Sequence, residues 1–234
     1  MQAIIKLITN PTEAFQELRD SSSWRYLFII IILVSGTFGI FSLKYSKSII
    51  EQRMEARKDA IIEAFDNKGM DGEAEYQKML ENATKIDKKK IIITGISSIF
   101  GIPIFYLLIT LVYFLISLII GVNSNYKGLF IILVYSNIVS LVEMIFKGIL
   151  MTIKGSAQIF TSPAVLLPLE KAGTPLFKLL NGFDIFTLWK LALVAIGISV
   201  FFNETKKKGY TVSIIFWVIS IIFSILLSKL TFFA

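Results

Sequence analysis

The segment WRYLFIIIILVSGTFGIFSL, Trp24–Leu43, is the first of five apolar stretches that decide the fold. The others cover residues 91–121, 128–151, 183–202 and 209–230. A helix needs about 20 mostly apolar residues to cross a hydrocarbon core of roughly 30 Å. Each stretch reaches that length, because Lys and Arg near its ends can extend their ammonium or guanidinium groups to the headgroups. The sequence therefore predicts an all-α membrane protein, a five-transmembrane-helix bundle.

Composition supports one membrane domain that covers residues 1–234. The chain is 55% hydrophobic, and its mean hydropathy is +0.71. A soluble domain of this size would have too little polar surface for such a composition. The net charge of +7 is modest, and basic residues beside spans indicate orientation and contact with anionic lipid. We therefore expect the lipid bilayer, and no nucleic acid, among the partners.

The first 23 residues carry the pattern of an amphipathic helix that leads into the first span. Asn10 is a suitable N-cap, and Pro11 fits the first helical position. Three residues then share one apolar face at helical spacing: Ala14, Phe15 and Leu18. We expect this helix, within the tail 1–23, to lie flat on the membrane surface. A plain polar tail is the alternative.

Residues 44–90, between the first two spans, are highly charged but nearly neutral. They contain 11 Lys and Arg and 10 Asp and Glu. Two apolar stripes at helical spacing flank a turn-forming segment, Asn67 to Gly72; they are Ile50, Met54, Ile61 and Phe65, and Tyr76, Leu80, Ala83 and Ile86. The pattern predicts an extramembrane helical hairpin that prolongs the first two spans. Its stripes can cover each other, dock a partner or form a dimer contact.

Ionisable residues inside spans are the candidate functional residues, because burying charge in lipid is expensive. Glu143 and Lys147 lie four apart in the third span and can pair on one helix face. Lys190 lies in the fourth span, at a matching depth of roughly 11–12 Å from the same membrane surface. Further polar groups of the third span are Tyr135, Ser136 and Asn137. The cluster is either an ion pair that locks two spans or a site for an ion, a proton or a lipid headgroup.

The sequence lacks the residues that most membrane enzymes require. The chain has no His and no Cys, which removes the commonest general base and the usual zinc ligands. Gly182-Phe183-Asp184 is similar to half of an aspartyl-protease motif, but no second aspartate lies in a span to share a proton. We therefore expect no enzyme activity, no cofactor and no metal site.

Several short motifs, taken in order, resemble the Yip-type membrane domain, the Ypt/Rab-interacting protein family with many bacterial members. They are Asn10-Pro11 with Phe15, Gly121 with Lys127 and Phe130, Tyr135-Ser136, Asp184-Ile185-Phe186 with Trp189, Ile196-Gly197, and the basic loop Lys206 to Lys208. The resemblance covers nearly the whole chain except residues 44–90. Family members often carry a proline shortly after the Tyr-Ser pair. Asn137, Ile138 and Val139 stand there instead, so we expect no helix break in the third span.

The resemblance implies five spans, a cytoplasmic N-terminus and no catalysis. Charge alone gives the opposite orientation, because seven basic residues flank the spans on the N-terminal side and fifteen on the other. We adopt the orientation that the resemblance implies, in the bacterial inner (plasma) membrane. The segment 44–90 is then extracytoplasmic.

Two functions follow as hypotheses. The first is a non-enzymatic scaffold or accessory protein that supports transport or trafficking machinery. Its partner would be another membrane or extracytoplasmic protein, such as a transporter complex, or a second copy of the chain in a homo-oligomer. The alternative is a small transporter or channel whose path is lined by Glu143, Lys147 and Lys190. Five spans without an inverted repeat argue mildly against alternating access.

Overall fold

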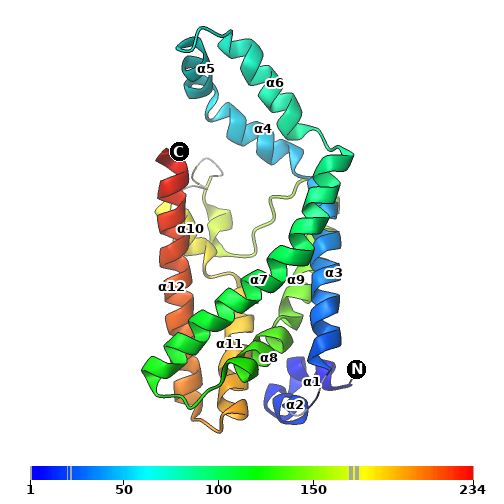
Figure 1. The fold of residues 1–234 in the computed structure, drawn as a ribbon, viewed down its shortest axis with the longest axis vertical. Helices are drawn as coiled ribbons and strands as arrows, with labels where there is room; N and C mark the ends of the chain where they lie inside the picture. Colours follow the sequence, from blue (N-terminus) through cyan, green and yellow to red (C-terminus); the bar gives the residue numbers. More distant parts are fainter. Residues whose placement is uncertain (1, 20, 22, 169–170, 172–173, 234) are drawn as a thin grey trace.

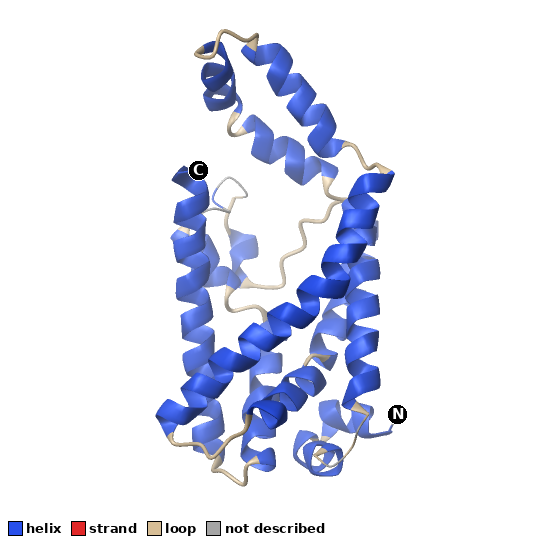
Figure 2. Ribbon diagram, in the orientation of Figure 1, coloured by secondary structure: helices blue, strands red, loops and turns tan. Residues whose placement is uncertain are grey.

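The computed structural model describes residues 2–19, 21, 23–168, 171 and 174–233. Within these residues the chain is all-helical, as predicted, and contains no strand (Figure 2). The long helices form a bundle, which α7 (Lys88–Ile120) crosses obliquely (Figure 1). Their shared core is apolar and lies where α2, α3, α7, α8, α11 and α12 meet.

Four helical segments are long and apolar enough to cross a membrane. The segments are α3 (Trp24–Leu43), α7 (Lys88–Ile120), α8 (Tyr126–Ser136) together with α9 (Ile138–Lys154), and the Lys206–Leu227 part of α12 (Lys206–Phe233). They match four of the five predicted spans. Asp87 caps the start of α7, and Gly121 ends it in the left-handed conformation at φ 73°, which glycine adopts without steric cost.

The predicted fourth span, 183–202, is shorter than expected. It corresponds to α11 (Ile185–Phe201), whose 17 residues extend about 25 Å, less than the hydrocarbon core. Its span length is reached only together with α10 (Pro175–Asn181), which is bent from α11 by 56°. The indole of Trp217 on α12 holds this bend by donating to the Gly182 carbonyl oxygen at 2.8 Å. The bundle therefore has four candidate spans, or five if the bent pair counts as one.

The expectation of an unbroken third span is wrong at one residue. α8 ends at Ser136 and α9 begins at Ile138, with Asn137 in a turn between them at φ −74° and ψ −1°. The Asn137 amide donates to the Leu133 and Val134 carbonyl oxygens, while its own carbonyl accepts from Ser140 and Leu141. The backbone groups at the break are thus satisfied locally, so no proline is needed to produce it.

The N-terminal tail forms two helices, α1 (Gln2–Thr9) and α2 (Pro11–Leu18). The Asn10 side chain caps α2 and Pro11 starts it, as predicted. The apolar face of α2 is buried and packs against α11, whereas we expected it to lie on the membrane. Phe15 is fully buried, and its ring meets that of Phe201 edge to face at 6.0 Å. The tail is therefore part of the core at this end of the bundle.

Residues 44–90 form three helices where two were predicted: α4 (Lys47–Glu55), α5 (Lys58–Asp66) and α6 (Gly72–Thr84). α6 packs against both α4 and α5. Ile86 of the second predicted stripe lies beyond the end of α6 and is 44% exposed. Non-helical residues at 44–46 and 85–87 separate this module from α3 and α7, so it does not simply prolong them. Figure 1 shows the α4–α6 module at one end of the molecule and α1 and α2 at the other.

Candidate functional site

The intramembrane charges gather where α9 meets the start of α11. Glu143 and Lys147 pair on α9, with Lys147 Nζ 2.5 Å from Glu143 Oε1. Lys147 Nζ also lies 3.7 Å from Asp184 Oδ2, at the start of α11. The three side chains are between 9% and 24% exposed. One ammonium therefore bridges two carboxylates and ties the two helices together.

Asp184 has the most contacts in this cluster. Its Oδ1 accepts from the backbone N–H groups of Phe186 and Thr187, which caps α11. Its Oδ2 accepts from the Thr161 hydroxyl. Asp184 thus fixes the start of α11, the loop before α10 and, through Lys147, the middle of α9.

Lys190 lies six residues after Asp184, nearly two turns along α11. Its ammonium donates to the Ser140 hydroxyl at 3.4 Å, which joins α11 to α9 a second time. The carboxylates of Glu143 and Asp184 are close enough to act on it electrostatically. Among the described residues, however, neither carboxylate lies within 4 Å of the Lys190 ammonium. The predicted Glu143–Lys190 neighbourhood is present without direct ion pairing.

The other three candidate residues are not part of this charged cluster. The Tyr135 hydroxyl lies 2.9 Å from the Ser23 hydroxyl, where the tail enters α3, and Tyr135 itself is fully buried. Ser136 is fully buried, and its hydroxyl has no hydrogen-bond partner in the part of the chain that the structure describes. Asn137 forms the break between α8 and α9. These residues shape the third span and do not extend a polar path from Glu143.

Each charged side chain of this cluster has a polar partner on α9 or α11. Glu143 and Asp184 share Lys147, and Lys190 is bound to Ser140. The sequence reasoning did not place Asp184 in this cluster, because it was weighed as half of a protease motif and as part of a family motif. The sequence pattern at Asp184, an Asp directly before an apolar helix, is typical of an N-cap and could have located it at the start of α11.

A second group of residues meets at the other end of α11. Gly197 on α11 lies directly beneath two side chains, since a Cβ added there would come within 2.6 Å of Ile132 Cγ2 and 3.1 Å of Phe15 Cζ. Gly209 on α12 approaches α11 closely, where an added Cβ would lie 2.2 Å from the Ala195 carbonyl oxygen. We call this contact of α2, α8, α11 and the start of α12 the interfacial junction. Two motifs that carry the family resemblance, Asn10-Pro11 with Phe15 and Ile196-Gly197, meet in it.

Comparisons with known proteins agree with that resemblance. The family model described as Yip1 domain matches residues 5–228. The chain is similar to membrane protein YknW of Bacillus subtilis (strain 168), at 25% identity over 229 residues, which is 95% of this chain and 88% of that protein. No solved structure matches the chain.

Proposed function

Since the chain belongs to the Yip1 domain family, we propose that it is a non-enzymatic scaffold or accessory protein of the membrane. The observation that carries this proposal is the division of the molecule into two parts. One is a bundle whose intramembrane charged side chains have partners within it, and the other is a projecting α4–α6 module (Figure 1). In this reading the bundle anchors the protein. The module contacts another protein, such as a component of transport or trafficking machinery.

The charged cluster supports an anchoring role for the bundle. A transport path needs polar groups that are free to receive an ion or substrate, whereas the carboxylates of Glu143 and Asp184 already have partners. Breaking a buried pair leaves an unmatched charge and destabilises the fold. The cluster therefore acts as a lock between α9 and α11.

The α4–α6 module has the surface expected of a binding element. Only Gly72 and Tyr76 are buried in its helices. Met70 and Met79 are 43% and 40% exposed, and methionine adapts its shape to a partner. Two hydrogen bonds link the module to the loop after α9, one from the Ala157 amide to the Tyr45 carbonyl oxygen and one between Gln158 and Gln52.

The orientation is part of the proposal. We place the N-terminus in the cytoplasm of a bacterial inner membrane, as the family resemblance implies, and the α4–α6 module outside. The chain has no Cys, so a single cysteine is a unique label. Met79→Cys in the module should react with an impermeant thiol reagent on intact cells, and Thr205→Cys should not. The reverse labelling pattern would overturn the orientation.

Crosslinking from the module tests the proposed role. A photoactivatable thiol reagent on Met79→Cys should give one defined adduct in native membranes. The matched control is Ile119→Cys, which is 83% exposed but lies at the other end of α7. An adduct of twice the chain's mass would mean a second copy, and a different mass would mean another protein. No adduct, or the same adducts from both positions, would contradict a partner-binding module.

The transporter reading is tested separately with Glu143→Gln. In a lock, this variant leaves Lys147 with Asp184 as its remaining carboxylate and lowers the thermal unfolding midpoint. In a transporter, it abolishes flux while the unfolding midpoint stays unchanged. Normal stability with lost flux in reconstituted vesicles would therefore replace the scaffold proposal with a transport function.

A further inference from the structure

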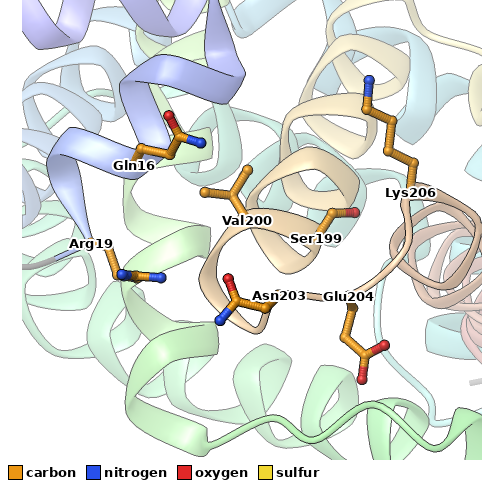
Figure 3. A pocket seen from close by; sticks show the side chains of 7 residues that line it. All are labelled: Gln16, Arg19, Ser199, Val200, Asn203, Glu204 and Lys206. Atoms are coloured by element: carbon orange, nitrogen blue, oxygen red, sulfur yellow. The ribbon is translucent and has the colours of Figure 1, made fainter.

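A cavity of about 500 Å³ opens at the end of the bundle that carries α1 and α2. Its walls come from the end of α2, the end of α11, and the turn that leads into α12. The lining residues are Gln16, Arg19, Ser199, Val200, Asn203, Glu204 and Lys206. Figure 3 shows Gln16 on α2 and Arg19 just after it on one side of Val200 and Asn203. Lys206 lies beyond Ser199 on the other side, with its ammonium directed away from them in this arrangement.

Two cations on this lining have no acidic partner among the described residues. Among the described residues, neither Arg19 nor Lys206 forms an ion pair within 4 Å. Asp20, next to Arg19 in the sequence, lies outside the described residues. Arg19 and Lys206 line the cavity from different segments, and a guanidinium with a flexible lysine side chain is suited to a group with several anionic oxygens.

The acidic residue of the lining is already neutralised. Glu204 lies 3.0 Å from the Lys208 ammonium and accepts from the Asn123 amide at 3.3 Å, and its side chain is 15% exposed. These bonds hold the pKa of the Glu204 carboxyl below its ordinary value, with the hydrogen bond from Lys208 as the largest cause and that from Asn123 next. Glu204 therefore stabilises the turn through its bonds to Lys208 and Asn123. Arg19 and Lys206 give the cavity its positive charge.

Neutral donors complete the lining. Asn203 adopts a left-handed backbone at φ 52°, which asparagine tolerates better than most residues, and Figure 3 shows its amide on the cavity side. The Gln16 amide faces the cavity from α2, and no side-chain hydrogen bond of either amide is present in the described residues. Four side chains with hydrogen-bond donors therefore line one cavity, from α2, the residue that follows it and the segment that leads into α12.

We propose that this cavity binds the phosphate of an anionic phospholipid headgroup. Its position at the ends of α11 and α12 places it at headgroup depth, where a phosphodiester is the abundant anion. Arg19 binds two phosphate oxygens through its planar fork, Lys206 supplies a second positive charge, and Gln16 and Asn203 donate to the remaining oxygens. This binding is independent of any protein partner, so it extends beyond the scaffold role.

The test compares two pairs of charge-removing substitutions in the full-length protein. Native mass spectrometry, after reconstitution with phosphatidylcholine and increasing phosphatidylglycerol, counts the anionic lipids retained. The wild-type protein should retain one phosphatidylglycerol saturably. Arg19→Gln with Lys206→Gln should weaken that retention by about tenfold. Lys127→Gln with Lys207→Gln removes two exposed charges at the same end of the bundle, outside the cavity, and should leave it unchanged.

A second arm separates the lipid from free phosphate. Inorganic phosphate is added to the protein in pure phosphatidylcholine nanodiscs, and the thermal unfolding midpoint is followed. A rise that Arg19→Gln with Lys206→Gln abolishes, without saturable phosphatidylglycerol retention, would overturn the lipid assignment. Equal loss from both pairs of substitutions, or a wild-type protein that neither retains phosphatidylglycerol nor responds to phosphate, would overturn the site itself. Arg19→Lys keeps the charge but not the fork, so partial recovery in that variant supports bidentate binding.

Discussion

The interfacial junction and the α4–α6 module are both helical, but they are stabilised in different ways. The junction buries Phe15 and Ile132 completely and brings Gly197 and Gly209 within contact of neighbouring helices. The three helices of the module bury only Gly72 and Tyr76. The stability of the protein should therefore depend on the junction, while the module is free to vary its surface for binding.

Phe15→Ala is the sharpest test of the junction's role. Removing a fully buried phenylalanine costs its transfer free energy and leaves a cavity, so the free energy of unfolding should fall by roughly 3 kcal/mol. Thermal unfolding in one detergent provides the measurement. Phe100→Ala is the matched control, because Phe100 is 65% exposed, and its midpoint should hardly move. Equal losses in the two variants would mean that the tail does not belong to the core.

Gly209→Ala tests the close approach of α12 to α11. The new Cβ would lie 2.2 Å from the Ala195 carbonyl oxygen, a backbone atom that cannot move away alone. Overpacking of this kind should cost about 2 kcal/mol, more than alanine gains by its helix propensity. Gly101→Ala on α7 meets no atom within 4 Å and should be neutral or slightly stabilising. A stable Gly209→Ala variant would show that the two helices can separate without loss.

Tyr76→Phe examines the module by itself. The Tyr76 hydroxyl donates to Glu55 Oε2 at 3.1 Å and links α6 to α4. Loss of this bond should lower the free energy of local opening of α4 and α6 by about 1 kcal/mol, so that their amides exchange faster. The unfolding midpoint of the bundle should not move. Tyr26→Phe, at a residue 73% exposed, should change neither quantity. A lower bundle midpoint for Tyr76→Phe would mean that the module and the bundle unfold together.

The two regions also differ in what the sequence could predict. Length and hydropathy located four spans, and the Asn10-Pro11 pair located the start of α2, because these are local signals. The break at Asn137 had no such signal, since Asn137 is held by hydrogen bonds to its own neighbours in the helix. The division of the first predicted arm into α4 and α5, and the shortness of α11, were not predicted from the sequence either.

The candidate site shows the same limit. Spacing along one helix gave the Glu143–Lys147 pair correctly. The bridge from Lys147 to Asp184 joins residues 37 apart, and no periodicity connects them. Tyr135 was grouped with Glu143 because both lie in the third span, yet its hydroxyl contacts Ser23 near the tail. Depth in the membrane can be estimated from sequence, but the direction in which a side chain points depends on how the helices pack.

The smallest effect should come from the charges on the outer side of the junction. Lys6 pairs with Glu13 at 2.8 Å and with Glu17 at 2.5 Å, and bridges α1 to α2. The hydrogen bonds with Glu13 and then Glu17 raise the pKa of Lys6 to about 12, and Lys6 lowers the pKa of Glu13 below its ordinary value of 4.5. The stability that Glu13 contributes to the contact of α1 with α2 is therefore present above pH 4.5 and is lost as the pH falls through the lowered pKa. That of Lys6 is present below pH 10.5 and is lost as the pH rises through about 12.

A spin label at Ile8→Cys should accordingly report an immobile α1 across the neutral range and a modest gain in mobility on acidification. Lys6→Gln should show the higher mobility at neutral pH and lose the acid dependence. Lys207→Gln, which forms no ion pair among the described residues, serves as the charge-matched control. The effect should be small because these side chains are 35% to 48% exposed, and water and salt screen such pairs. If acid released α2 as well as α1, charge rather than the burial of Phe15 would hold the junction, and the contrast with the module would disappear.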